Sequence, residues 1–180
     1  MARSVREVLL EAQRIGALGP RPIDDVIAHA RAFVDALPSS TRRVVDLGTG
    51  AGIPGLVIAD ARPDVRVVLV DRRAKRTDAL AVAVAGLGWR GRVEVLCADA
   101  DALARDPAHT ASYDAVVSRG FGPHETTLRV SAQLAAPGGA IVISEPPDGE
   151  PNRWRPELVA ELHLDGPERL GPVARFTRSS

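Results

Sequence analysis

From residue 43 onward, short valine-rich runs alternate with alanine-rich stretches whose apolar residues recur at helical spacing. This alternation constrains the fold strongly, because strands that alternate with helices pair in parallel and are covered by helices on both faces. We therefore expect an α/β fold with a doubly wound, mostly parallel sheet. The predicted strands are Arg43–Leu47, Val65–Asp71, Arg92–Cys97, Tyr113–Ser118 and Ala140–Glu145, and the predicted helices are Gly55–Ala61, Ala74–Leu87 and His124–Leu134.

Two helices are predicted before the first strand, so the core has a short helical N-terminal preface. Ser4 and Glu7 have the spacing of a capping box, and apolar residues from Val5 to Ile15 follow at helical spacing. The segment Ile23–Leu37 carries its apolar residues on one face.

The end of the chain predicts a short helix near Pro156–Leu162 and then a β-hairpin. In this hairpin, Leu162–Leu164 and Val173–Thr177 flank the turn residues Asp165-Gly166-Pro167. We expect residues 1–180 to form a single domain. Within it, residues 1–38 are the helical preface, and residues 39–180 are the α/β core and the hairpin.

Composition limits the partners and the setting. The chain has 23 basic and 23 acidic side chains, so it lacks the overall basic excess of many nucleic-acid binders. No stretch approaches the roughly 20 apolar residues of a membrane span. The single cysteine, Cys97, excludes an internal disulfide and a cysteine-based metal cluster, and we expect it in the core. With Glu7 and Glu11 interrupting the first apolar run, these features predict a cytoplasmic protein that does not bind membranes.

The histidines give no sign of a metal site. His29, His109, His124 and His163 lie apart in the sequence, without the spacing of metal ligands, and each is expected on the surface or in a turn.

Four glycines, at positions 48, 50, 52 and 55, lie between the first predicted strand and the helix that follows it. Glycine has no Cβ and tolerates positive φ, so the backbone can approach a ligand closely. The N–H groups at the start of the helix are expected to point at that ligand. A tight turn alone would need only one or two of these glycines. The loop therefore predicts a bound nucleoside cofactor.

Acidic residues at the ends of three successive predicted strands refine this prediction. A carboxylate at Asp46 is unfavourable beside the pyrophosphate of a dinucleotide, and it suits the ammonium and sulfonium of S-adenosylmethionine. Asp71 can bind both hydroxyls of a ribose. We expect Asp99 to accept from an adenine amino group and the N–H near Ala100 to donate to the ring, with Asp101 as the second candidate for the acid.

These motifs resemble class I S-adenosylmethionine-dependent methyltransferases. The segment Asp46–Leu56, with its distinctive Pro-Gly-Leu end, is similar to the loop of the bacterial small-subunit rRNA guanine-N7 methyltransferases of the glucose-inhibited division protein B type. The resemblance covers about residues 40–145. Its further segments are Leu69-Val70-Asp71 with Lys75-Arg76, Tyr113–Arg119 and Pro137-Gly138-Gly139.

The resemblance implies a Rossmann-like methyltransferase sheet, S-adenosylmethionine as cofactor, and a role in rRNA processing. It implies rRNA or the small ribosomal subunit as partner and a guanine N7 as methyl acceptor. A guanine N7 lone pair needs no deprotonation, so no catalytic residue is assigned and the expected mechanism is one of positioning. The residues expected to bind the cofactor are Asp46, Gly48, Thr49, Gly50, Ala51, Gly52, Asp71, Arg72, Asp99 and Ala100.

Arg119 follows the fourth predicted strand and is expected to contact the substrate, through a guanine edge or a phosphate. A surface salt bridge is the alternative role for this side chain.

Three other functions remain open: a methyltransferase acting on a small molecule or protein, a non-catalytic homologue that keeps the nucleoside pocket, and an NAD-linked oxidoreductase, against which Asp46 argues. The chain departs from the family where Glu145-Pro146-Pro147 follows strand five in place of a lysine and glycine, and Asp148–Arg155 has no counterpart. The oligomeric state is left open.

Overall fold

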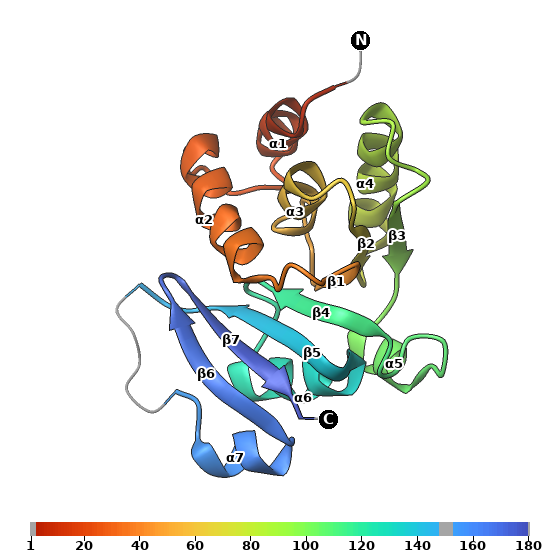
Figure 1. Ribbon diagram of the computed structural model, residues 1–180. Helices are drawn as coiled ribbons and strands as arrows, with labels where there is room; N and C mark the ends of the chain where they lie inside the picture. The colour runs from red at the N-terminus through yellow and green to blue at the C-terminus, as the bar shows by residue number, and fades with distance from the viewer. Residues whose placement is uncertain (1–2, 148–152, 180) are drawn as a thin grey trace.

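The computed structural model describes residues 3–147 and 153–179. Its sheet has seven strands in the order β3-β2-β1-β4-β5-β7-β6 (Figure 1). The first five strands in chain order pair in parallel, while β7 is antiparallel to β5 and β6 is antiparallel to β7. The predicted α/β fold, with its mostly parallel sheet and C-terminal hairpin, is confirmed. The strands are β1 (Arg43–Leu47), β2 (Arg66–Asp71), β3 (Val93–Cys97), β4 (Tyr113–Ser118), β5 (Ala135–Ser144), β6 (Leu164–Leu170) and β7 (Val173–Arg178).

Helices cover both faces of this sheet, with α1 to α4 on one side and α5 to α7 on the other (Figure 1). Within the described ranges, none of the helices has the length and apolar character needed to cross a membrane. The helices are α1 (Val5–Arg14), α2 (Ile23–Ala36), α3 (Gly55–Ala61), α4 (Ala74–Gly86), α5 (Ala100–Arg105), α6 (His124–Leu134) and α7 (Pro156–Glu161).

The valine-rich strands form because both of their faces are buried. Successive side chains of a strand point to opposite faces, so Val44 packs under α1 to α4 while Val45 packs against α5 to α7. The same alternation separates Val67 from Val68. A strand buried on both faces needs a continuous apolar run, which is the pattern seen in the sequence.

The capping box predicted at the first helix is confirmed. The Ser4 N–H donates to Glu7 Oε2 at 2.7 Å, and the Glu7 N–H donates to Ser4 Oγ at 3.2 Å. The helix ends at Arg14, so Ile15, which was predicted on its apolar face, lies just beyond it and is 55% exposed.

The predicted position of the hairpin turn is wrong. The chain turns at Gly171-Pro172, whereas Asp165-Gly166-Pro167 lies inside β6. The register between β6 and β7 shifts between Asp165 and Glu168. Because β6 is an edge strand, a bulge there absorbs the proline, which has no N–H to pair.

The structure differs from the sequence prediction in three smaller respects. β5 begins at Ala135, so Pro137-Gly138-Gly139 lies within the strand, at a register shift with β4. Helix α5 was not predicted, because six residues are too few to show helical periodicity. Cys97 is exposed rather than buried in the core, since β3 is an edge strand.

The chain that follows β5 is anchored by Trp154, which is 5% exposed. Its Nε1 donates to Glu145 Oε1 at 2.6 Å. Its ring lies edge-on to Phe176 and His124, with centroid distances of 5.0 and 5.5 Å. Of the segment Asp148–Arg155, residues 148–152 lie outside the described residues.

Replacing the acceptor at this anchor tests its contribution to stability. We expect Glu145→Ala to lower the free energy of unfolding by about 1–3 kcal/mol, because the buried indole N–H loses its partner. Glu145→Gln keeps an acceptor oxygen and should cost less. Urea denaturation measures both, with Glu157→Ala, at an exposed position of α7, as the control. An Ala variant as stable as the wild type would show that Glu145 does not anchor Trp154.

Candidate functional site

A cavity of about 310 Å³ lies where the strands β1 to β4 end. The strand order reverses between β1 and β4, and open α/β sheets bind ligands at this edge. A volume of this size is in the range of small-molecule sites. The cavity is lined by five residues predicted to bind the cofactor and by the second candidate for the adenine contact, namely Gly48, Asp71, Arg72, Asp99, Ala100 and Asp101.

Asp71 joins the two loops that border this cavity. Its Oδ2 accepts from the Gly50 N–H at 3.2 Å, and its Oδ1 accepts from the Arg73 N–H at 2.9 Å. The guanidinium of Arg76 lies 3.5 Å from Oδ2. The side chain is only 6% exposed, so its position is fixed from three sides while it still faces the cavity. This is a carboxylate held ready for hydroxyl donors, because each oxygen keeps further acceptor capacity.

Asp46, at the end of β1, is fully buried beneath the glycine loop. Its Oδ2 accepts from Thr49 Oγ1 at 2.7 Å and from the Gly55 N–H at 2.9 Å. Its Oδ1 is buried and has no hydrogen-bond partner among the described residues. A buried acceptor without a donor is costly. Asp46 does not line the 310 Å³ cavity, so a positively charged ligand there would act on this carboxylate through its charge.

Burial raises the pKa of Asp46 to about 7. The two hydrogen bonds from Thr49 and Gly55 act in the opposite direction, as does attraction to Arg119, whereas repulsion from Asp71 adds to the effect of burial. Desolvation dominates because the carboxylate loses more hydration energy than two neutral donors return. The group accordingly titrates near neutral pH.

The glycines of the loop serve two purposes. A Cβ at Gly55 would lie 2.2 Å from Leu69 Cδ2 and 2.8 Å from Asp46 Oδ2, so this glycine is needed for packing inside the protein. Gly50 has a φ of +58°, and its nearest neighbour on that side is the Arg76 guanidinium at 3.6 Å. A Cβ at Gly50 would thus meet only ordinary contacts, so this position favours glycine because of its positive φ.

The prediction that the N–H groups at the start of the helix point at a ligand is wrong for α3. The Gly55 N–H is bound to Asp46, and the next N–H groups donate to Gly52 O and Pro54 O. The loop closes as turns over residues 51–54, which places its own carbonyls in reach of these donors. The same closure buries Thr49 and Gly52, while Gly50 and Ala51 line a neighbouring cavity.

Asp99 is the N-cap of α5. Its Oδ1 accepts from the N–H groups of Asp101 and Ala102, at 3.0 and 3.1 Å. Both Asp99 and Asp101 line the cavity. Capping fixes the orientation of Asp99, whereas Asp101 makes no side-chain bond to another described residue.

Arg119 is half-buried directly after β4 and does not itself line the 310 Å³ cavity. Burial lowers its pKa, and the nearby charge of Arg21 lowers it further, while Asp46 acts in the opposite direction. His29 interacts with the same arginine. Its pKa is lowered by burial first and then by Arg119 and Arg21.

The prediction that His29 lies on the surface or in a turn is wrong. The residue lies half-buried inside α2, and its Nε2 is buried without a hydrogen-bond partner among the described residues. Helix periodicity gives the reason, because His29 is next to the buried Ala30 and one turn before the buried Phe33.

Sequence reasoning missed the segment after β4. Gly120, Phe121, Gly122 and Pro123 all line the cavity. A Cβ at Gly48 would lie 2.8 Å from Phe121 Cδ2, so the aromatic ring packs closely over the first glycine of the loop. The signal was present, since Gly-Phe-Gly-Pro follows a strand at the same edge as the predicted acids. No group of three potential metal ligands occurs in the part of the chain that the structure describes.

Comparison with known proteins identifies the family. A sequence profile described as GidB, rRNA small subunit methyltransferase G, matches residues 5–145. A ribosomal RNA small subunit methyltransferase G from Nocardioides is 40% identical over 131 residues, covering 71% of this chain and 50% of that protein. One from Salinispora tropica is 36% identical over 133 residues, covering 71% and 54%. The chain thus spans about half the length of these curated relatives.

Solved structures show the same fold at low sequence identity. An O-methyltransferase family protein from Burkholderia thailandensis superposes with a TM-score of 0.64 at 20% identity, covering 87% of this chain and 58% of that one. A protein described as a predicted O-methyltransferase, from Agrobacterium tumefaciens, has a TM-score of 0.59, also at 20% identity, with coverages of 83% and 80%. These structures show the fold alone. The sequence matches show the family: this chain belongs to the GidB family, rRNA small subunit methyltransferase G.

Proposed function

We propose that this chain binds S-adenosylmethionine in the 310 Å³ cavity and directs its methyl group to small-subunit rRNA, with a guanine N7 as the acceptor atom. The observation that carries this proposal is the row of carboxylates at the ends of β1, β2 and β3, formed by Asp46, Asp71 and Asp99. Membership of the rRNA small subunit methyltransferase G family supports the RNA acceptor.

The residues present fit this cofactor. The negative charge of Asp46, beneath the loop, would attract a cationic group of the ligand, and Asp71, which lines the cavity, would accept from ribose hydroxyls. Asp99 keeps one carboxylate oxygen free of the cap for an amino donor, beside the N–H of Ala100. Arg72 completes the adjoining wall of the cavity. The backbone of the loop would form the remaining contacts, through Gly48, Thr49, Gly50, Ala51 and Gly52.

S-adenosylmethionine, when bound, supplies the methyl group and its own leaving group. The chain's task is then to align the acceptor, which lowers the entropic part of the barrier. A guanine N7 has a free lone pair, so no residue needs to remove a proton. Arg119 is proposed to orient the acceptor through a guanine edge or a phosphate, since it directly follows β4, its charge interacts with that of Asp46, and it lacks an ion-pair partner within hydrogen-bond distance among the described residues.

The same proposal treats residues 1–180 as one methyltransferase domain acting in the cytoplasm. It is supported by the packing of α1 and α2 on the helices that cover the sheet. A small-molecule or protein acceptor is the second candidate, because the chain has no net positive charge to attract RNA. Methyl transfer from labelled S-adenosylmethionine to small-subunit RNA, taken from a strain lacking the enzyme, decides between them.

Asp46→Asn tests the role of the buried acid. The folded state holds a proton up to a pKa of about 7, against 3.8 ordinarily. The contribution of Asp46 to the free energy of unfolding is therefore full below about pH 4 and is lost as the pH rises through 7. This loss amounts to roughly 4 kcal/mol. An asparagine cannot ionise, so the variant should escape the loss, yet it should bind S-adenosylmethionine at least tenfold more weakly.

Urea denaturation between pH 4 and 8 and titration calorimetry measure the two effects. Asp25→Asn, at an exposed position in the first turn of α2, is the matched control. Parallel pH profiles for the wild type and Asp46→Asn would contradict the raised pKa, and equal affinities would contradict the contact with the ligand.

Asp99→Asn and Asp101→Asn separate the two candidates for the adenine contact. Asparagine is as good an N-cap as aspartate, so Asp99→Asn should keep α5 while removing the carboxylate. We expect it to weaken binding of S-adenosylhomocysteine several-fold in calorimetry, and Asp101→Asn to leave the affinity unchanged. The reverse pattern would assign the contact to Asp101.

Arg119→Gln tests orientation of the acceptor. The variant should bind S-adenosylhomocysteine with unchanged affinity but lose at least tenfold of its methyl transfer to small-subunit RNA, because it no longer carries the fork of donors. Arg90→Gln is the control, since Arg90 is exposed and precedes β3 at the opposite edge of the sheet. Equal transfer rates for both variants would leave Arg119 with a structural role only.

A further inference from the structure

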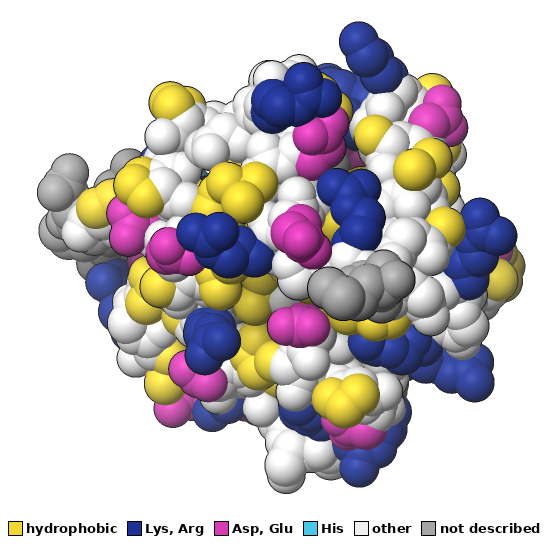
Figure 2. Space-filling model, turned by 90° about the horizontal axis from the view of Figure 1, so that it is seen from above, with side chains coloured by type: hydrophobic (Ala, Val, Ile, Leu, Met, Phe, Trp, Pro, Cys, Tyr) yellow, Lys and Arg dark blue, Asp and Glu magenta, His cyan; other side chains and the backbone are white. Residues whose placement is uncertain are grey.

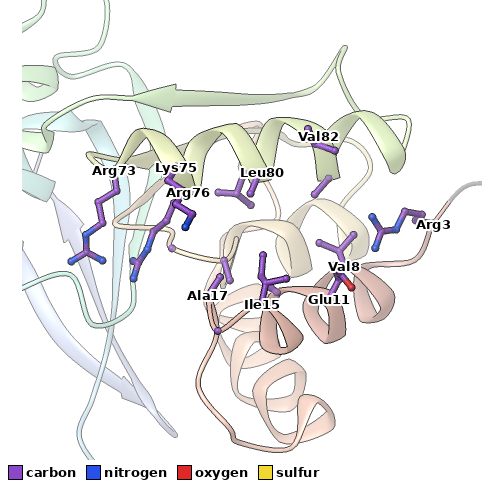
Figure 3. A pocket seen from close by; sticks show the side chains of 16 residues that line it. Arg3, Val8, Glu11, Ile15, Ala17, Arg73, Lys75, Arg76, Leu80 and Val82 are labelled. Carbon is purple, nitrogen blue, oxygen red and sulfur yellow. The ribbon is translucent and has the colours of Figure 1, made fainter.

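A second cavity, of about 570 Å³, lies outside the site described above, between α4 and the segment formed by α1 and residues 15–17. Figure 3 shows α4 along one wall and α1 with Ile15 and Ala17 along the other. We call this cavity the α1–α4 groove. It is larger than the proposed cofactor cavity and borders the glycine loop, because Gly50 and Ala51 line it.

The middle of the groove is apolar. Val8 and Ile15 face Leu80 and Val82 across it (Figure 3). Two of these side chains are unusually exposed for their type, Ile15 at 55% and Val82 at 70%. Apolar side chains gathered in a concave, exposed surface are typical of a ligand site rather than of a random surface position.

One end of the groove is basic. Arg73, Lys75 and Arg76 lie together at the end nearest the glycine loop (Figure 3). Arg76 is engaged with Asp71, but neither Arg73 nor Lys75 has an ion-pair partner among the described residues. At the far end, Arg3 lies near Glu11, whose carboxylate is already bonded to Arg14 at 2.7 Å. Unpaired positive charge therefore concentrates at the end nearest the glycine loop.

The face above α1 and α4 shows the same combination. In Figure 2, hydrophobic side chains lie among Lys and Arg side chains on this face, and acidic side chains lie between them. A ligand with one anionic end and an apolar body would match both properties at once.

The shape of the groove limits the ligand further. An α-helix with its side chains is about 10–12 Å wide, so 570 Å³ would hold only roughly one turn of it. Small residues line the groove between the two apolar walls, among them Ala12, Ala79 and Ala83. From Arg76 to Ala83 the groove follows α4 for roughly 10 Å. These dimensions suit a slender chain rather than a helix from a partner protein.

The lining also disfavours a nucleotide. None of the described residues that line the groove is aromatic, so a base would have no ring to stack on. An unbranched alkyl chain needs no such partner, because its binding energy comes from apolar area removed from water.

We propose that the α1–α4 groove binds an anionic amphiphile, with its alkyl chain between Ile15, Leu80 and Val82 and its carboxylate or phosphate at Arg73 and Lys75. This proposal does not rest on the proposed methyl transfer. The groove shares Arg73 and Arg76 with the proposed cofactor cavity and is also lined by Gly50 and Ala51 of the glycine loop, but binding in the groove is measured without cofactor or RNA. Its failure would thus leave the proposed function untouched.

Titration calorimetry of the full chain with decanoate, below its micelle concentration, tests the proposal. We expect saturable binding of one decanoate. Ala79→Trp, which fills the groove from α4, should weaken it at least tenfold. Ala81→Trp is the matched control, because Ala81 is an exposed alanine of the same helix that does not line the groove. Lys75→Gln should weaken binding several-fold, with a smaller dependence on salt.

Val82→Glu is a second variant in case Ala79→Trp folds poorly, since it places a negative charge at a 70% exposed position of the wall and should also weaken binding at least tenfold. Three outcomes would overturn the proposal. The first is no saturable binding of decanoate, and the second is equal affinity for decanoate and the neutral decan-1-ol. The third is self-association of the wild type in sedimentation that Ala79→Trp abolishes, which would assign the groove to a second copy of the chain.

Discussion

The buried carboxylate of Asp46 is the interaction on which the geometry of the proposed cofactor site depends. One of its oxygens binds both Thr49, within the glycine loop, and Gly55, at the first residue of α3. The end of β1, the loop and the helix are therefore held by a single acceptor atom. Burial makes the charged form of this group expensive, so its pKa rises to about 7. A buried carboxylate with one unpaired oxygen costs free energy, and the positive charge of a bound ligand would lower that cost.

Asp71 performs the complementary task on the other side of the loop. It ties Gly50 to the start of α4 through Arg73, and Arg76 lies beside it. The loop is thus fixed between two carboxylates that belong to neighbouring parallel strands. Because the strand order reverses next to β1, the space above these ends stays open, and the proposed cofactor cavity occupies it. The strand order that defines the fold therefore also places the proposed cofactor cavity.

Much of the fold could be predicted from the sequence because buried parallel strands and amphipathic helices leave strong periodic signals. β1, β4, α3 and α6 have the predicted bounds. The failures have local causes. Asp165-Gly166-Pro167 has the composition of a turn, but an edge strand can absorb it as a bulge. Cys97 sits in an apolar run, and only the order of strands reveals that β3 is an edge.

The site was predicted less completely than the fold. Strand ends brought Asp71 and Asp99 to one cavity as expected. Sequence could not show that Asp46 lies wholly beneath the loop, that its hydrogen bonds occupy the first N–H of α3, or that Phe121 packs over Gly48. The first two facts depend on how the loop closes over Asp46, and the third is a contact between segments distant in the chain. The α1–α4 groove could not be predicted from the sequence either, because its two walls, α1 and α4, are far apart in the chain.

The most direct test of this account is the pH titration of the Asp46 carboxyl carbon by nuclear magnetic resonance, with and without S-adenosylmethionine. The account predicts a midpoint near 7 in the free protein, set by burial, and a clear fall when the ligand's positive charge binds above the loop that covers this carboxylate. A midpoint near 4 in the free protein, or one that saturating ligand leaves unchanged, would contradict it.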